Sequence, residues 1–242
     1  DLLDPLIDAS ALELPGDVDS LVAEFSQFEA EDDYQHILDA VRQRVGEWRF
    51  ALGVQLIEGT CDPIAIGAGL ARVAEAACRV LTDATVEEFR RAHGDVPESE
   101  LLILALGRYG GSVLTHASDL DIVYLFTGTF AGESTGRRPI GSALYFNRLS
   151  QRVTAALTAP TAQGALFEVD TRLRPSGTQG PPAASIDSFE RYQREQAWTW
   201  EHMAMARARP VYGSSSAREN LAATIRDILT TSRDPAKLRA DV

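Results

Sequence analysis

The spacing of hydrophobic residues between positions 34 and 94 is typical of two amphipathic helices. In the first, apolar side chains recur every three or four residues, at Ile37, Val41, Val45, Trp48, Leu52 and Leu56. This spacing places them on one face of a helix over 34–59, whose N-terminus suits the acidic run "EAEDD". A second helix is expected from about Ile66 to about His93, and Gly94 is its stop signal.

After Pro97 the hydrophobic pattern changes to that of short strands. The runs "LLILAL" (101–106) and "DLDIVYLF" (119–126) are almost continuously apolar, and we expect them to pair like a hairpin around a glycine-containing connection. Apolar residues at 144, 149, 153 and 157 predict a helix, and "LFEVDTRLRP" (166–175) predicts a third strand. One long helix is expected to follow from Asp187, with Glu190 as a capping-box-like residue, through "FERYQREQAWTWEHMAMARAR".

These elements predict an α+β fold. The N-terminal part, 1–97, is expected to be a helical module, and the remainder, 98–242, a domain with a small mixed sheet flanked by helices. The chain begins with Asp1 and stops in a charged stretch, so we expect it to be a fragment of a longer chain. Single aromatic and methionine residues at helical spacing, among them Trp48, Trp198, Trp200, Met203 and Met205, are expected in the core.

Two aspartates stand at the start of the second apolar strand. Asp119 and Asp121 are two residues apart, so in a strand both side chains project from the same face. Two carboxylates that close repel each other unless a cation or hydrogen-bond donors compensate, and a divalent metal is the usual compensation. The alternative is a strand-start pair that water solvates at the edge of a loop. The spacing alone leaves both interpretations open.

The predicted third strand adds further charged residues. Its alternation puts Phe167, Val169, Thr171 and Leu173 on one face, and Glu168, Asp170, Arg172 and Arg174 on the other. Three carboxylates, counting Asp170, can hold two Mg²⁺ ions, and two metals can stabilise both oxygens of a phosphoryl displacement. The planar forks of the two arginines suit phosphate oxygens. Their alternative role is to neutralise Glu168 and the aspartates.

Composition and charge narrow the classes of function. The 242 residues contain no apolar run long enough for a membrane span and no basic leader, which indicates a soluble protein. Cys61 and Cys78 fit neither a metal site nor a disulfide framework, which indicates a reduced cytoplasmic setting. The net charge is −12, and the acidic excess lies in residues 1–100, which argues against a long nucleic acid as partner. A small anionic ligand that binds to residues 101–242 remains compatible with this charge distribution.

Three sequence blocks resemble known proteins. "GRYGGSVLTHASDLDIVYLF" is similar to the nucleotide-transfer motif of the polymerase-beta-like nucleotidyltransferase superfamily, in which a glycine pair precedes an Asp-x-Asp strand. Within it, "FEVDTRLRPSGTQGP" and "FERYQREQAWTWEHMAMARARPVYG" resemble the glutamine synthetase adenylyltransferases. The resemblance is close over 101–213 and looser, at the level of helical pattern, over 34–99.

The resemblance implies an activity and a set of site residues. It implies that AMP is moved between ATP and a tyrosine hydroxyl of glutamine synthetase, and that PII-type signalling proteins and glutamine act on the whole enzyme. By carry-over, two Mg²⁺ ions would bind Asp119, Asp121 and Asp170. The triphosphate would be held by Gly110, Gly111, Ser112 and Ser118, with Arg172 and Arg174.

"RLRPSG" followed by "AWTWEH" resembles the half of the family that attaches AMP. Two alternatives remain open: the half that removes AMP by phosphorolysis, and a non-catalytic module that senses nucleotide or docks glutamine synthetase. His116 and His202 are expected to be loop or packing residues and not metal ligands.

Overall fold

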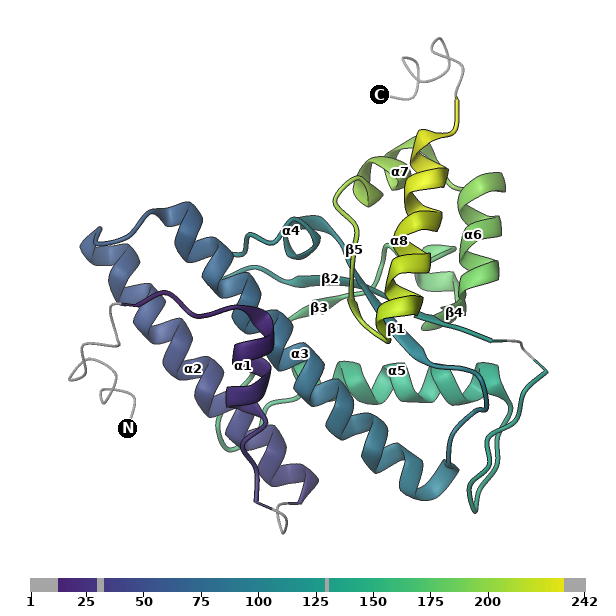
Figure 1. The fold of residues 1–242 in the computed structure, drawn as a ribbon, viewed down its shortest axis with the longest axis horizontal. Helices are drawn as coiled ribbons and strands as arrows, with labels where there is room; N and C mark the ends of the chain where they lie inside the picture. The colour runs from purple at the N-terminus through teal and green to yellow at the C-terminus, as the bar shows by residue number, and fades with distance from the viewer. Residues whose placement is uncertain (1–12, 30–32, 129–130, 233–242) are drawn as a thin grey trace. The chain divides into compact units, whose positions relative to one another are not determined.

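The computed structural model describes residues 13–29, 33–128 and 131–232. The chain forms two compact units (Figure 1). Unit 1 consists of residues 1–88, 112–119 and 152–168, and unit 2 of residues 89–111, 120–151 and 169–242. The predicted α+β class is confirmed, because helices flank a small mixed sheet.

Three helices, α1 (Val18–Phe25), α2 (Tyr34–Glu58) and α3 (Pro63–His93), come first along the chain. The Asp33 side chain caps α2 by accepting a hydrogen bond from the backbone N–H of His36, and Gly59 ends it. The two predicted helices are therefore confirmed, although α3 starts earlier than expected, at Pro63. The short helix α1 was not predicted.

Within unit 1, a buried arginine of α2 binds backbone oxygens at the end of a later helix. Arg42 is almost fully buried on α2, and its guanidinium donates to the backbone oxygens of Leu38 (2.9 Å), Ala156 (2.7 Å) and Ala159 (2.8 Å). Burial lowers the pKa of Arg42. Ala156 and Ala159 lie at the C-terminal end of α5 (Ser142–Thr158), where carbonyl oxygens lack helical partners and a positive charge is favourable. Arg42 thus caps α5.

The sheet of unit 2 contains five strands. β1 (Leu101–Ala105) and β2 (Leu120–Phe126) pair antiparallel, as predicted, with Ile103 opposite Tyr124. β3 (Val169–Asp170) and β4 (Ala183–Ser185) both pair parallel with β2, and β5 (Arg209–Tyr212) pairs antiparallel with β1. The strand order is β3-β2-β1-β5, with β4 also on β2. β4 and β5 were not predicted.

Helices α6 (Ile186–Glu195), α7 (Thr199–Met205) and α8 (Ser215–Thr230) lie together beside the sheet in unit 2 (Figure 1). Val123 and Leu125 of β2 join a core cluster with residues of these helices. Its other buried members are Leu102, Leu104, Leu106, Ala184, Phe189, Met205, Ala217, Leu221, Ile225 and Ile228. Phe126, which alternation places on the opposite face, stacks on Phe146 of α5 with ring centroids 4.6 Å apart.

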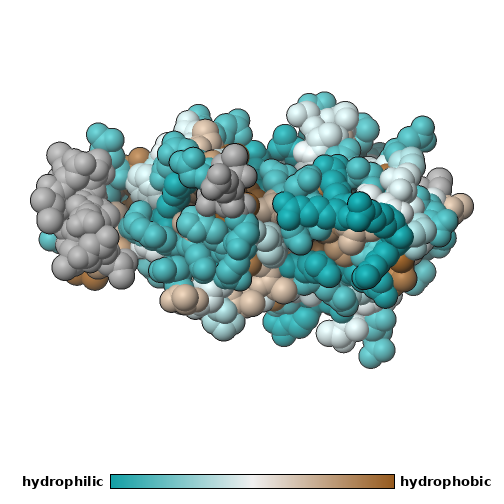
Figure 2. All heavy atoms as spheres, turned by 90° about the horizontal axis from the view of Figure 1, so that it is seen from below, coloured by the Kyte–Doolittle hydropathy of each residue, from teal (hydrophilic) through white to brown (hydrophobic). Residues whose placement is uncertain are grey.

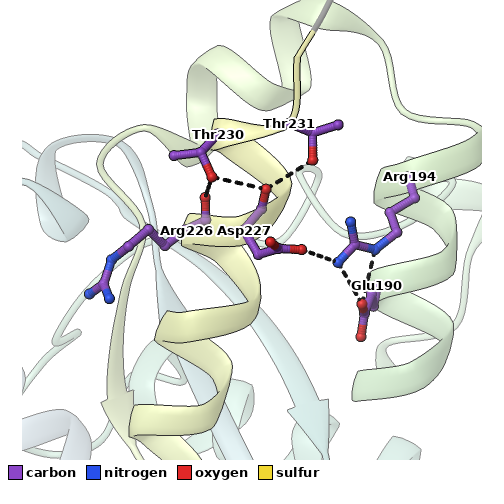
Figure 3. Close-up of polar contacts among 6 residues, drawn as sticks. All are labelled: Glu190, Arg194, Arg226, Asp227, Thr230 and Thr231. Atoms are coloured by element: carbon purple, nitrogen blue, oxygen red, sulfur yellow. Dashed lines mark hydrogen bonds and ion pairs between the residues drawn. The ribbon is translucent and has the colours of Figure 1, made fainter.

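Charged side chains link α6 to α8 at the surface (Figure 3). Arg194 donates to Glu190, one turn earlier on α6, at 2.8 Å, and to Asp227 of α8 at 2.6 Å. Arg226 neighbours Asp227, but no interaction of its guanidinium is drawn (Figure 3). Exposed ion pairs of this kind each contribute about 0.2–1 kcal/mol, so the apolar cluster beneath them carries most of the attachment.

The predicted long helix over 187–209 is wrong, because α6 and α7 are separate helices. The backbone N–H groups of Gln196 and Ala197 both bond to the Tyr192 carbonyl oxygen, which ends α6. The carboxylate of Glu201 then accepts from the backbone N–H of Trp198 at 2.8 Å and starts α7. The N-cap of α6 is Ser185 instead of Asp187.

This break also changes which side chains are buried. Trp198, Trp200 and Met203 are 69%, 55% and 57% exposed, so their predicted core positions are wrong, whereas Met205 is buried as predicted. Trp48 is half-buried and donates its indole N–H to Glu24. On the face that Figure 2 shows, hydrophilic residues predominate and hydrophobic ones are scattered between them. No helix in the described part of the chain has the length and apolar character needed to cross a membrane.

A buried tyrosine in unit 2 gives a pH-dependent prediction. Tyr145 of α5 is 3% exposed, donates its hydroxyl to the Gly94 carbonyl oxygen at 2.9 Å, and has its pKa raised to about 12 by burial. The unfolded chain ionises this group near 10.0, so the contribution of Tyr145 to stability is complete below pH 10 and is lost between pH 10 and 12. The expected slope is about 1.4 kcal/mol per pH unit.

Urea unfolding of Tyr145→Phe and wild type across this pH range checks the prediction. The variant should lose about 1 kcal/mol at neutral pH, from the missing hydrogen bond, and should show the shallower decline above pH 10. Equal slopes for the two proteins would mean that Tyr145 ionises in the folded chain as easily as in the unfolded one.

Candidate functional site

Two aspartates lie side by side on neighbouring strands of unit 2. β2 and β3 are parallel, and their register pairs Leu120 with Val169 and Asp121 with Asp170. In-register residues of adjacent parallel strands project from the same face and are separated by about 4.8 Å between strands. Both residues are half-buried. The structure therefore brings together two of the three predicted carboxylates.

A glycine that the sequence interpretation overlooked lies against Asp121. Gly107 opens the four-residue helix α4 (Gly107–Gly110), and the preceding residue, Leu106, donates its N–H to the Asp121 carbonyl oxygen at 2.8 Å. A Cβ atom on Gly107 would fall 2.1 Å from Oδ2 of Asp121. Gly107 also has φ +55°, a conformation that favours glycine. The carboxylate thus occupies space that a larger residue would fill.

The predicted glycine pair lies at the other end of the same turn. A Cβ atom on Gly110 would meet the backbone oxygen of Arg207 at 2.2 Å and that of Ala105 at 2.7 Å. A Cβ atom on Gly111 would come within 3.3 Å of Cδ of Arg207. These glycines therefore allow close packing of the segment before β5 against α4. Their predicted contact with a triphosphate stays a prediction, and Arg207 is a neighbour that sequence reasoning did not assign to the site.

Three further predicted site residues, Ser112, Ser118 and Asp119, belong to the segment 112–119 of unit 1. Ser112 is exposed with φ +57°, and Oγ of Ser118 accepts from the backbone N–H of Thr115 at 2.9 Å. Asp119 is exposed and directly precedes β2, so it is not a strand residue. Across residues 13–29, 33–128 and 131–232, no three His, Cys, Asp or Glu side chains gather as a metal site. Binding of two metals by three carboxylates stays a prediction.

Arg172 neutralises Asp170 in this structure. Its Nε donates to both carboxylate oxygens at 3.0 and 2.9 Å, its Nη2 to Oδ2 at 2.5 Å, and its backbone N–H to Oδ1 at 2.8 Å. Hydrogen bonding from Arg172 holds the pKa of Asp170 below its usual value, against the opposing effect of burial. The Arg172 side chain is 77% exposed, so its attachment to Asp170 is made at the surface.

Arg174 stabilises the loop that follows β3. β3 ends at Asp170, so the predicted long third strand is wrong, and Arg172 and Arg174 do not alternate along a strand. The Arg174 guanidinium donates to the Thr171 carbonyl oxygen (2.9 Å), to the Thr171 hydroxyl (3.0 Å) and to the Gly180 carbonyl oxygen (3.2 Å). The reason for the short strand is that the backbone turns at Thr171, whose oxygen accepts from the Arg174 N–H.

These contacts predict a loss of stability when Arg174 is removed. Arg174→Ala is expected to lower the free energy of unfolding by about 2 kcal/mol, because three acceptors lose a charged donor. Urea unfolding measures it, with Arg226→Ala on α8 as the matched arginine control. Unchanged stability of Arg174→Ala would show that the loop holds its conformation without this side chain.

His116 and His202 both contact backbone oxygens. Nε2 of His116 lies 2.8 Å from the Arg49 carbonyl oxygen, and Nε2 of His202 lies 2.8 Å from that of Gln193. This confirms their prediction as loop or packing residues. Cys61 and Cys78 are both free thiols, and Cys78 is buried.

Comparison with known proteins extends these observations. The family described as glutamate-ammonia ligase adenylyltransferase matches residues 1–224. A relative from Brucella suis biovar 1 (strain 1330) is 41% identical over 87% of this chain, one from Agrobacterium fabrum (strain C58) 42% over 86%, and one from Mesorhizobium japonicum 37% over 99%. Each is named bifunctional glutamine synthetase adenylyltransferase/adenylyl-removing enzyme. The chain spans only 22%, 21% and 24% of their respective lengths.

Proposed function

Because the chain belongs to the glutamate-ammonia ligase adenylyltransferase family, we propose that it carries a nucleotidyltransferase site that moves AMP from ATP to a tyrosine of glutamine synthetase. The observation that carries the proposal is the pairing of Asp121 with Asp170 on parallel strands, with the glycine turn α4 directly against Asp121. The domain is proposed to have the polymerase-beta-like fold that the sequence predicts.

The residues present suit Mg²⁺. Carboxylate oxygens are the ligands that this cation prefers, and Asp121 and Asp170 offer them from one face of the sheet. The exposed Arg172 guanidinium already shows that the Asp170 carboxylate accepts a cationic partner. Asp121 and Asp170 would hold Mg²⁺, with Asp119 as the proposed third ligand and two ions as the proposed number. Bound Mg²⁺ supplies neutralisation of the phosphate charge during the transfer.

The proposed reaction is an in-line displacement at the α-phosphorus of ATP. The tyrosine oxygen forms a bond to this phosphorus, the bond to the bridging oxygen of the leaving pyrophosphate breaks, and the tyrosine proton passes to a base. Asp170 is the proposed acceptor of that proton, which requires its carboxylate to exchange part of its contact with Arg172. The glycine turn α4, followed by Gly111 and Ser112, would lie along the triphosphate.

The names of the relatives cover both attachment and removal of AMP, so the direction of transfer rests on a separate observation. The blocks "RLRPSG" and "AWTWEH" resemble the attaching half, and this resemblance supports attachment for the present chain. Removal would use the same carboxylates, with inorganic phosphate in place of the tyrosine as the attacking group.

A transfer assay tests the proposal. The chain is incubated with Mg²⁺, unmodified glutamine synthetase and ATP labelled at the α-phosphate, and protein-bound label is measured. We expect label on glutamine synthetase. Label that instead leaves adenylylated glutamine synthetase on addition of phosphate would assign the removing activity. Absence of both reactions, with nucleotide bound, would favour a non-catalytic sensing or docking module.

Regulation and cellular setting follow only from the family. We propose that PII-type signalling proteins and glutamine act on the longer enzyme, and that the enzyme works in the cytoplasm.

A further inference from the structure

One arginine in unit 2 lies beside the glycine turn and has no assigned role. Arg207 is exposed in the segment between α7 and β5. The close approach of its carbonyl oxygen to Gly110 fixes its backbone, and its Cδ lies against Gly111. The aliphatic part of the Arg207 side chain therefore runs along the turn, and packing against Gly110 sets the position of the Arg207 backbone.

Three of the arginines near the turn and β3, namely Arg172, Arg174 and Arg207, differ in the contacts that they already make. Arg172 binds the carboxylate of Asp170, and Arg174 binds the loop oxygens of Thr171 and Gly180. No ion pair or side-chain hydrogen bond joins Arg207 to another residue within 13–29, 33–128 or 131–232. Among these three, Arg207 is therefore the one whose guanidinium keeps its hydrogen-bond donors available to a ligand.

The ends of the turn carry opposite charges. The Asp121 carboxylate touches Gly107 at the first residue of α4, and the Arg207 stem touches Gly111 directly after its last residue. A metal-bound polyphosphate needs both kinds of group, since carboxylates hold the cation and a guanidinium fork binds the phosphate oxygens. The turn between them is too tightly packed at Gly107 and Gly110 to accept larger residues.

We propose that Arg207 binds phosphate oxygens of the nucleotide at the glycine turn. The inference rests on the proposed function and adds to it a binding residue. It also gives Gly111 a specific purpose. A Cβ at this position, 3.3 Å from Cδ of Arg207, would push the stem away from the turn and with it the guanidinium.

Equilibrium binding of MgATP and of magnesium-bound inorganic triphosphate to the full 242-residue chain tests the proposal by calorimetry. The variants are Arg207→Gln, which removes the charge and keeps much of the stem, and Arg207→Lys, which keeps the charge without the fork. Arg226→Gln on α8 is the matched control, because Arg226 is also an exposed arginine of unit 2 (Figure 3). Thermal unfolding of each variant shows whether it is folded.

Arg207→Gln is expected to weaken binding of both ligands about tenfold or more, Arg207→Lys to weaken it less, and Arg226→Gln to change it less than about twofold. All three should unfold near the wild-type temperature. Wild-type affinity in a folded Arg207→Gln variant overturns the inference and leaves the proposed function standing. If the wild-type chain binds neither ligand, the proposed function fails and the inference fails with it.

Discussion

Asp121→Asn is expected to reduce the rate of AMP transfer about a thousandfold or more, a barrier increase of ~4 kcal/mol. The carboxylate is paired with Asp170 across β2 and β3, and asparagine keeps its size but not its anionic oxygens. Stability should be unchanged or slightly higher, because the repulsion between the two carboxylates is relieved. Initial rates of transfer from labelled ATP, with circular dichroism and urea unfolding, measure both effects.

Asp227→Asn is the matched control for this substitution. Asp227 lies on α8 in unit 2 and pairs with Arg194 at the surface, so its replacement should leave the transfer rate unchanged. A rate for Asp121→Asn within about threefold of wild type, a barrier change below ~1 kcal/mol, would remove Asp121 from the mechanism.

Gly107→Ala is expected to reduce AMP transfer about a hundredfold while the chain still folds. The new methyl group would stand 2.1 Å from Oδ2 of Asp121, so the carboxylate must move, and misplacement of a reacting group by about 1 Å can cost this factor. The φ of +55° adds about 1–2 kcal/mol of backbone strain for alanine. Transfer rates at saturating ATP, compared with urea unfolding, separate the two consequences.

Gly59→Ala supplies the control for backbone strain alone. Gly59 has φ +67°, and no atom lies within 4 Å of a Cβ built on it. It should therefore lose similar stability and keep its full transfer rate. If Gly107→Ala and Gly59→Ala lose stability alike and both transfer AMP at the wild-type rate, Gly107 does not position Asp121.

Elements with a strong local signal were predicted from the sequence. The periodic apolar residues of α2 and the stop signal at Gly94 identify two helices, because a helix that buries one face needs that spacing. The continuous apolar runs of β1 and β2 identify a pair of buried strands. The short strands β3, β4 and β5 were missed or misjudged in length, since two to four residues carry no period and pairing partners decide them.

The prediction of one long helix from Asp187 to Arg209 was wrong for a similar reason. The residues 186–205 are compatible with a continuous helix, yet Glu201 binds the backbone N–H of Trp198 and starts a new one. Such a side-chain cap depends on a local competition between backbone conformations that periodicity does not report. The break turns Trp198 and Trp200 to the surface, where the sequence pattern had placed them in the core.

In the candidate site, residue types were easier to predict than neighbours. Asp121 and Asp170 could be chosen because a carboxylate within an otherwise apolar strand is costly unless a cation or a hydrogen-bond donor compensates its charge. The β2–β3 register then brings the two residues together. Gly107 and Arg207 could not be chosen, since their contacts with Asp121 and Gly111 depend on how separate segments pack in three dimensions. A signal for Gly107 existed in its place directly after the apolar run "LLILAL" (101–106).

The most direct test of the central claim is mass spectrometry of glutamine synthetase incubated with this chain, ATP and Mg²⁺. We expect a tyrosine peptide that gains the mass of one AMP group, and no such gain when ATP is omitted or Asp121→Asn replaces the wild type. Glutamine synthetase that stays unmodified in the presence of the folded, ATP-binding wild-type chain would contradict it.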